Sequence, residues 1–173
     1  MRAGCARAAK APLAMRPDSL KPGLMVAVLV TALDQLSKWM ILEIVMQPPR
    51  IIPVTPFFNL VLVWNRGVSF GFLGQQSSEW LPWLLTALAL AIVVALVWWL
   101  RRVTSGLMVL AISLVVGGAL GNVVDRLRFG AVVDFLDFHA TGVHWPAFNA
   151  ADSAITVGAV LILYDAIFAD RTS

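Results

Sequence analysis

The sequence predicts an all-α membrane protein with four transmembrane helices, a small outer segment that resembles a β-sheet, and an extracytoplasmic loop or short helix. Three observations support this fold class. Of the 173 residues, 60% are hydrophobic and only 13% are charged, whereas a soluble domain has about 25% charged residues. The mean hydropathy is +0.83. Two uncharged stretches are also long enough to cross about 30 Å of hydrocarbon. This composition excludes a water-soluble globule, a disordered chain and a disulfide-stapled secreted fold.

Two of the four predicted spans carry no charge, and two contain charged residues. The uncharged spans cover residues 81–100 and 106–124. The other two cover residues 23 to about 46 and 147 to about 169, and their apolar background is dense enough for membrane helices. Their charged residues are Asp34, Lys38, Glu43, Asp152 and Asp165.

We expect a single membrane domain with two short tails. Residues 1–22 form a basic tail, residues 23–169 form the four-helix domain, and residues 170–173 form a C-terminal tail. Within the domain, an outer β-like segment covers about residues 47–80 and an outer loop covers about residues 125–146. The first span is too long and too charged for a signal peptide, so we expect it to remain in the protein.

The positions of lysine and arginine predict that both termini are cytoplasmic. Eight of the 13 lie on one side of the membrane if the four spans alternate, and cytoplasmic segments are enriched in these residues. They are Arg2, Arg7, Lys10, Arg16, Lys21, Arg101, Arg102 and Arg171. The two long loops therefore belong to the outer face.

The two outer segments have different patterns. Residues 50–72 are rich in β-branched and aromatic residues, and apolar and polar residues alternate around 58–65. Four prolines between positions 48 and 56 argue against a helix, so we expect short strands and turns. Residues 129–144 mix apolar and polar groups, and we expect an interfacial or re-entrant stretch there.

Charged and amide side chains at membrane depth are costly, so they mark candidate functional sites. Asp34 and Lys38 are four residues apart and can pair on one helix face. Such a pair either braces the first helix or lines a site and orients another group there. Both interpretations remain open at this point.

Two Asn-x-x-Asp pairs lie at the outer ends of predicted helices. Asn122 and Asp125 end the third span, and Asn149 and Asp152 begin the fourth. Asp134 lies between them in an apolar context. Polar caps at helix ends would explain one such pair, but explain two pairs and Asp134 less readily.

Three aspartates, Asp125, Asp134 and Asp152, can therefore converge at one depth, where Arg126 and Arg128 could neutralise one of them. Two acids close together in a low-dielectric site share a proton. One carboxylate can then activate water while the other protonates a carbonyl group. This chemistry is that of an aspartyl peptidase.

Other functions fit the sequence less well. His139 and His144 with Asp137 match no standard zinc spacing, and Ser69 has no membrane histidine as its base. We expect no metal, no cofactor and no nucleic acid. The alternative is a small membrane transporter or channel subunit that uses buried acids as an ion relay. Against it, the acids cluster at one face of the membrane.

Five sequence blocks resemble the type II signal peptidase family, the lipoprotein signal peptidases of bacteria. In chain order they are DQLSKW from Asp34, WNRGVSFG from Trp64, GALGNVVDR from Gly118, VVDF from Val132 and FNAADS from Phe148. The resemblance covers about residues 24–168 and does not extend to the first twenty residues. The second block departs mildly from the family pattern at Arg66 and at Val68-Ser69.

The resemblance implies an intramembrane-type aspartyl endopeptidase of the bacterial inner membrane, with the sheet-like segment in the periplasm and the site near the outer leaflet. Its substrates are diacylglyceryl-modified prolipoproteins, which it cuts just before the lipidated cysteine. The implied catalytic dyad is Asp134 and Asp152, although Asp125 has also been a candidate in such families. The implied supporting or substrate-binding residues are Asp34, Lys38, Asn65, Gly118, Asn122, Asp125, Arg126 and Asn149. We expect a monomer that works in contact with membrane lipid.

Overall fold

The computed structural model describes residues 19–67 and 80–168. Predictions for the remaining residues lie outside this description. They concern most of the basic N-terminal tail, the later part of the outer segment, which includes Ser69, and the C-terminal tail.

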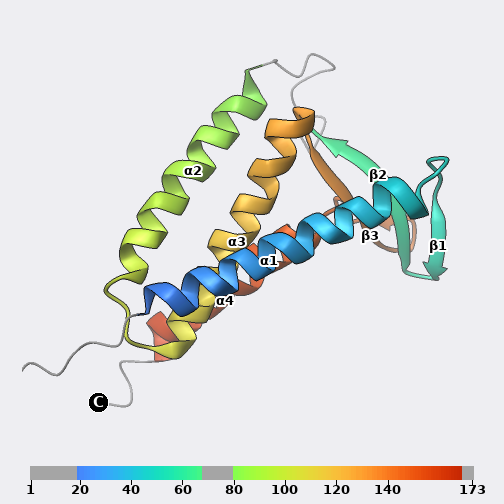
Figure 1. Ribbon diagram of the computed structural model, residues 1–173. Helices are drawn as coiled ribbons and strands as arrows, with labels where there is room; N and C mark the ends of the chain where they lie inside the picture. The colour runs from blue at the N-terminus through green and yellow to red at the C-terminus, as the bar shows by residue number, and fades with distance from the viewer. Residues whose placement is uncertain (1–18, 68–79, 169–173) are drawn as a thin grey trace, which may run out of the picture.

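Four long helices form the body of the protein (Figure 1). They are α1 (Leu20–Met40), α2 (Leu81–Leu100), α3 (Gly106–Phe129) and α4 (Ala150–Phe168), and a π-helix, η1 (Ile41–Val45), extends α1. All four are long and apolar enough to cross a membrane, which confirms the four predicted spans. Their limits differ slightly from the prediction, because α1 begins within the predicted tail and α3 continues beyond residue 124.

Helix α3 is the central helix of the bundle. Its apolar stretch is 61% buried, against 22% or less for the other three helices, and all three pack against it. Glycines allow this close approach: a β-carbon on Gly117 would lie 2.6 Å from the Ala27 carbonyl oxygen, and one on Gly158 would lie 2.6 Å from that of Ala111. Lipid tails are as apolar as the helices, so close backbone packing of this kind holds membrane helices together.

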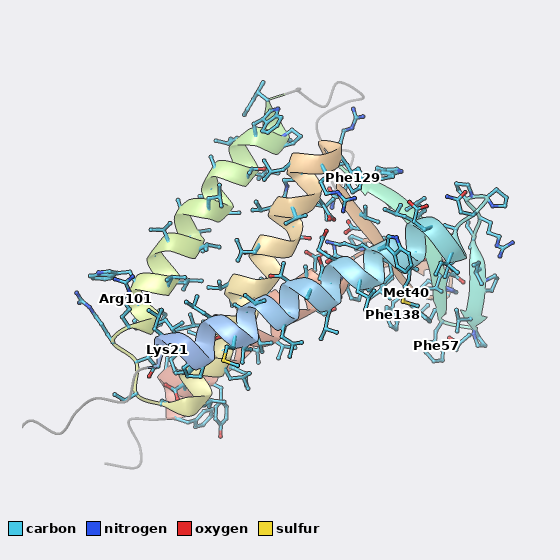
Figure 2. All side chains as sticks on the ribbon, viewed as in Figure 1. Lys21, Met40, Phe57, Arg101, Phe129 and Phe138 are labelled. Carbon is cyan, nitrogen blue, oxygen red and sulfur yellow. The ribbon has the colours of Figure 1, made fainter. Side chains whose placement is uncertain are left out.

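The outer faces of the other helices carry large exposed apolar side chains (Figure 2). Met25 on α1, Val94 on α2 and Leu163 on α4 are all more than half exposed. A water-soluble protein would bury such side chains, whereas lipid solvates them. The surface of the bundle therefore agrees with its membrane-spanning composition.

A four-stranded antiparallel sheet lies at the end of the bundle where α1 and α3 end and α4 begins (Figure 1). Its strands, in spatial order, are β1 (Ile52–Thr55), β2 (Phe58–Asn65), β3 (Val132–Ala140) and β4 (Val143–His144). The first two confirm the strands expected in the outer segment.

The prediction of a loop, re-entrant stretch or short helix after α3 was wrong. Residues 132–140 form β3, which pairs with β2 so that Asn65 lies opposite Val132. The first four residues of β3 are all buried. A strand that is buried on both faces shows no alternation of apolar and polar residues, so the usual strand signal is absent.

Gly130 determines where α3 ends. It adopts a left-handed conformation with φ of 68°, and its N–H donates to the Arg126 carbonyl oxygen at 2.9 Å. This C-cap is one that glycine forms without strain. It turns the chain directly into β3 and so determines where Asp134 lies relative to α3.

The packing at Gly117 can be tested by the same substitution at two positions. Gly117→Ala should reduce the free energy of unfolding by about 1–3 kcal/mol, because the new methyl group would push α1 away from α3. Gly106→Ala is the matched control, because a β-carbon there meets nothing within 4 Å; it should be neutral or slightly stabilising. Equal thermal unfolding midpoints of the two variants in detergent would contradict this packing.

Candidate active site

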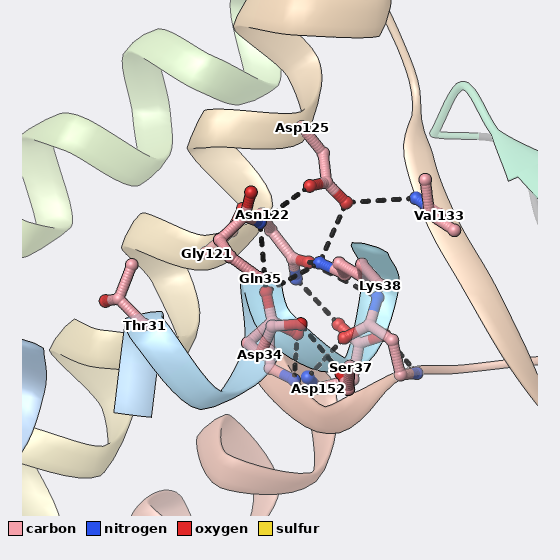
Figure 3. Close-up of polar contacts among 12 residues, drawn as sticks. Thr31, Asp34, Gln35, Ser37, Lys38, Gly121, Asn122, Asp125, Val133 and Asp152 are labelled. Atoms are coloured by element: carbon pink, nitrogen blue, oxygen red, sulfur yellow. Dashed lines mark hydrogen bonds and ion pairs between the residues drawn. The ribbon is translucent and has the colours of Figure 1, made fainter. Parts of the chain in front are cut away.

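One buried lysine binds three side chains at the junction of α1 and α3 (Figure 3). The Lys38 Nζ lies 2.8 Å from Asp34 Oδ2, 2.8 Å from Asp125 Oδ2 and 3.1 Å from Asn122 Oδ1. An ammonium group has three protons, so each has an acceptor. Its side chain is only 3% exposed. The structure thus contains the predicted Asp34–Lys38 pair and adds Asp125 to it.

The two carboxylates on Lys38 each reach the backbone of another element. Asp125 Oδ2 accepts from the Val133 N–H at 3.0 Å, and Asp34 Oδ1 accepts from the Ala151 N–H at 2.9 Å. Val133 directly precedes Asp134, and Ala151 directly precedes Asp152. Lys38 with Asp34, Asn122 and Asp125, which we call the Lys38 cluster, therefore holds the backbone next to both predicted catalytic residues.

Two glycines of α3 make room for this arrangement. A β-carbon on Gly121 would collide with the Asp34 carboxylate, and one on Gly118 would collide with the Ala151 carbonyl oxygen. Gly118 was predicted as a site residue from the family resemblance. In the structure it contributes space, because it lets the first turn of α4 lie directly against α3.

Asp134 is buried and held by two amide groups. Its Oδ1 accepts from Asn149 Nδ2 at 2.7 Å, and its Oδ2 accepts from Asn65 Nδ2 at 2.9 Å. Burial raises the pKa of Asp134 to about 6, and the negative charge of Asp152 adds to this, although the hydrogen bonds from Asn65 and Asn149 act in the opposite direction. This carboxyl group therefore retains a proton far more readily than an exposed aspartate does.

Asp152 begins α4 as part of a reciprocal cap. Its backbone N–H donates to Asn149 Oδ1 at 3.0 Å, while its Oδ2 accepts from the Asn149 N–H at 3.2 Å. This arrangement is a capping box, so the interpretation as a polar cap is correct for this pair. The positive end of the helix dipole also favours negative charge on Asp152.

Asn122 and Asn149 connect the parts of the site. Asn122 Nδ2 donates to Asp152 Oδ1 at 2.8 Å, and its Oδ1 accepts from Lys38. Asn149, which is fully buried, donates to both Asp134 and Asp152. The lysine therefore orients the Asn122 amide so that its NH₂ group faces Asp152.

The predicted supporting pair of Asp125 and Arg126 is not formed as an ion pair among the described residues. Asp125 is bound by Lys38 and by Gln35, whose Nε2 lies 2.8 Å from its Oδ1. Adjacent residues on a helix point in different directions, so Arg126 does not follow Asp125 into the cluster. Its guanidinium lies 3.5 Å from the Asn122 carbonyl oxygen and interacts electrostatically with all three aspartates.

Gln35 is the site residue that sequence reasoning missed. It lies within the first sequence block, DQLSKW, and no role was predicted for it. Its Nε2 donates to Asp125, to the Gly121 carbonyl oxygen at 3.2 Å and to Asp34 at 3.3 Å. Its position could have been recognised from the sequence, because a polar amide beside Asp34 within a membrane span marks a candidate functional residue.

A cavity of about 600 Å³ opens beside Asp152. Asn65 lines it from the sheet, and its apolar walls come from α4 and from the segment that precedes it. These walls include Trp145, Phe148 and Val157. Asp152 and Asn65 thus face a large, mostly apolar groove, and Asp134 is bound to Asn65 behind it. Such a groove is expected for a site that binds an apolar substrate.

The histidines form a separate cluster on the sheet. His144 Nδ1 lies 2.8 Å from Asp137 Oδ1, and Asn59 Nδ2 donates to the same carboxylate at 2.9 Å. Burial raises the pKa of Asp137, but these hydrogen bonds outweigh burial, and the pKa lies below its usual value. The His139 ring stacks on the His144 ring. Within the described ranges, no group of three metal-binding side chains could hold an ion.

A sequence model of the family described as signal peptidase (SPase) II matches residues 26–168. The chain belongs to the signal peptidase II family. With four candidate spans, it is a multi-pass membrane peptidase of that family.

Curated relatives agree with this assignment. A protein named lipoprotein signal peptidase from Polynucleobacter necessarius subsp. necessarius is 49% identical over 152 residues, which cover 87% of this chain and 91% of the relative. A protein of the same name from Burkholderia vietnamiensis is 51% identical over 148 residues, which cover 85% of this chain and 88% of the relative.

A solved structure described as a bacterial membrane enzyme, determined by the in meso method, has the same fold as this signal peptidase II. The TM-score is 0.72 at 33% identity, and the match covers 87% of this chain and 90% of the other. A second such structure matches with a TM-score of 0.73 at the same identity, over 85% of this chain and 93% of the other. These enzyme neighbours fit a peptidase and not the transporter alternative.

The Lys38 cluster should be essential for folding. Lys38→Met leaves two carboxylates buried without a cation, which should reduce the free energy of unfolding by about 3–5 kcal/mol. Adding Asp34→Asn should recover part of this loss, because one uncompensated charge is removed. Lys21→Met, at an exposed lysine on the same helix, is the control and should cost less than about 1 kcal/mol. Thermal unfolding in detergent measures all three, and no recovery in the double variant would contradict the charge argument.

Proposed function

We propose that the protein is an aspartic endopeptidase that removes the signal peptide from diacylglyceryl-modified prolipoproteins, with Asp134 and Asp152 as its catalytic dyad. One observation carries the choice of dyad: both carboxylates are held by Asn149 and neither has a cation bound to it among the described residues. The third candidate, Asp125, is already paired with Lys38. The names of the relatives support the substrate class.

In this mechanism Asp152 acts as the base and Asp134 as the acid. Asp152 lies at a helix N-terminus, which favours its negative charge, while Asp134 retains a proton because of burial. Asp152 takes a proton from water, and the water oxygen attacks the scissile carbonyl carbon as Asp134 protonates the carbonyl oxygen. When the tetrahedral intermediate collapses, Asp152 returns its proton to the leaving nitrogen and Asp134 takes back the hydroxyl proton.

The amide groups around the dyad orient the two carboxylates. Asn65 and Asn149 hold Asp134 in one rotamer, and Asn122 holds Asp152. A fixed carboxylate geometry reduces the reorganisation needed during the reaction. Lys38 positions the two carboxylates indirectly. Its cluster fixes the backbone at Val133 and Ala151 and orients the Asn122 amide.

The groove beside Asp152 suggests how the substrate binds. Its apolar walls suit the lipidated part of a prolipoprotein, which enters sideways from the bilayer while the signal helix lies alongside the spans. The segment to be cut lies extended near the sheet, where Asn65 contacts the dyad. Cleavage just before the lipidated cysteine then places the scissile carbonyl at Asp134 and Asp152. The chemistry needs no metal or organic cofactor, and one chain supplies both acids, so we propose a monomer.

The distribution of positive charge supports a periplasmic sheet and a site near the outer leaflet of the inner membrane. Lys21 and Arg101 lie at the end of the bundle opposite the sheet (Figure 2), and Arg102 follows in the same turn between α2 and α3. Basic residues in short connections favour the cytoplasmic side. Both termini would then be cytoplasmic, and residues 23–169 would form the membrane peptidase domain.

The dyad can be tested by cleavage of a purified diacylglyceryl-modified prolipoprotein. Asp134→Asn and Asp152→Asn should each reduce kcat by at least about 10³-fold, because each removes one partner in proton transfer. Asp125→Asn should only reduce activity, because Asp125 acts through Lys38. Asp137→Asn, on the same strand as Asp134, is the matched control and should cleave normally. An active Asp134→Asn variant with an inactive Asp125→Asn variant would move the dyad to the helix ends.

The role of Asp134 as the acid predicts a shift in the pH profile. The rate falls at high pH when the acid loses its proton, so kcat/KM declines as pH rises through the pKa of the free enzyme's acid. Asn65→Ala removes a hydrogen bond that lowers the pKa of Asp134, so the alkaline limb should move to higher pH. Asn59→Ala, on the same strand but bound to Asp137, should leave the limb in place. A limb that stays fixed or moves down in Asn65→Ala would exclude Asp134 as the acid.

A further inference from the structure

A second cavity, of about 260 Å³, lies between the end of α1 with η1, the end of α3, and β2. None of its lining residues lines the groove beside Asp152. We propose that this cavity binds the headgroup of a zwitterionic phospholipid, with Arg128 at the phosphate and Glu43 at the ammonium group. This proposal does not depend on the assignment of the dyad.

The first argument is that the two charged groups at this cavity are free to bind a ligand. Glu43 and Arg128 both line it and both are exposed, and no ion pair joins either to another described residue. Lys38 and Asp125 also line it, but each is paired with the other. The Arg128 guanidinium lies 4.8 Å from the Phe129 ring centroid, a cation–π contact that restrains its position.

The second argument is the balance of charge. The cavity has two cationic and two anionic lining residues, so it has no net attraction for an anion. A zwitterionic headgroup offers one partner for Arg128 and another for Glu43. An anionic headgroup would satisfy Arg128 but would leave Glu43 facing a like charge. The diacylglyceryl group of the proposed substrate has neither a phosphate nor an amine, so it would not use these residues.

The third argument is the position and size of the cavity. It lies at the ends of two membrane spans, and it is lined by Trp39 and Trp64, a residue type that is enriched at the headgroup level of a bilayer. The π-helical turn η1 supplies both Leu42 and Glu43, and such turns frequently mark functional sites. A volume of about 260 Å³ would hold several water molecules at about 30 Å³ each, or a small polar headgroup.

The proposal can be tested by native mass spectrometry of the delipidated full-length protein in a nonionic detergent. The probes are phosphatidylethanolamine and phosphatidylglycerol with the same acyl chains, and glycerophosphoethanolamine without acyl chains. The variants are Arg128→Gln and Glu43→Gln. Arg50→Gln is the matched control, because Arg50 is exposed near the same end but does not line the cavity.

We expect the wild-type protein and Arg50→Gln to bind phosphatidylethanolamine about tenfold more tightly than phosphatidylglycerol, the effect of about one charge-assisted hydrogen bond. Arg128→Gln should weaken binding of both lipids, whereas Glu43→Gln should remove the preference and strengthen binding of phosphatidylglycerol. Arg128→Lys and Glu43→Asp keep the charges and should keep the preference for phosphatidylethanolamine. They test the proposal if a glutamine variant does not fold.

Any of three results would overturn the proposal. The first is a wild-type protein that binds both lipids equally, and the second is a Glu43→Gln variant that retains the preference. The third is glycerophosphoethanolamine binding as tightly as the whole lipid, because the ligand would then be a soluble phosphate ester and not a membrane lipid.

Discussion

The three hydrogen bonds of the Lys38 ammonium group are the interaction on which the rest of the site depends. They join α1 to α3 through Asp125 and Asn122, while Asp34, bound to the same lysine, reaches the first turn of α4. Asp125 in turn holds the start of β3. Removing the charge of Lys38 would leave two buried carboxylates without a cation. The resulting loss of folding free energy would exceed the net stabilisation that the intact ion pairs provide. The charge of Lys38 also reaches the proposed dyad, because it lowers the pKa of Asp134.

Three aspartates at the same end of the bundle show how the surroundings of a side chain set its role. Asp125 faces a cation, Asp134 lies buried among amide donors on a strand, and Asp152 lies at the N-terminus of a helix beside an open groove. Only the surroundings differ, yet Asp125 is paired with a lysine, whereas the two carboxylates of the proposed dyad are held by amide and backbone N–H groups. The asparagines make this separation possible, because an amide can hold a carboxylate without neutralising it.

The sequence was sufficient for features that depend on composition and local spacing. Four spans followed from apolar length, and the Asp34–Lys38 pair followed from helical periodicity. The partner of Asp125 could not be predicted, because Lys38 and Asp125 lie 87 positions apart and meet only through the packing of α1 on α3. Strand β3 was missed for a different reason: burial on both faces removes the alternating pattern by which a strand is recognised. Predicting either feature requires knowing which elements pack together.

The four-residue spacing of Asp34 and Lys38 has a consequence for how the chain enters the membrane. The first span is synthesised before the third, so Lys38 is made before its partners Asp125 and Asn122. Because its ion-pair partner lies one turn away on the same helix, the span can insert as a nearly neutral unit without waiting for the rest of the bundle. Asp34 can therefore neutralise the lysine through Oδ2 during insertion, while its Oδ1 stays available for the Ala151 N–H at the start of α4.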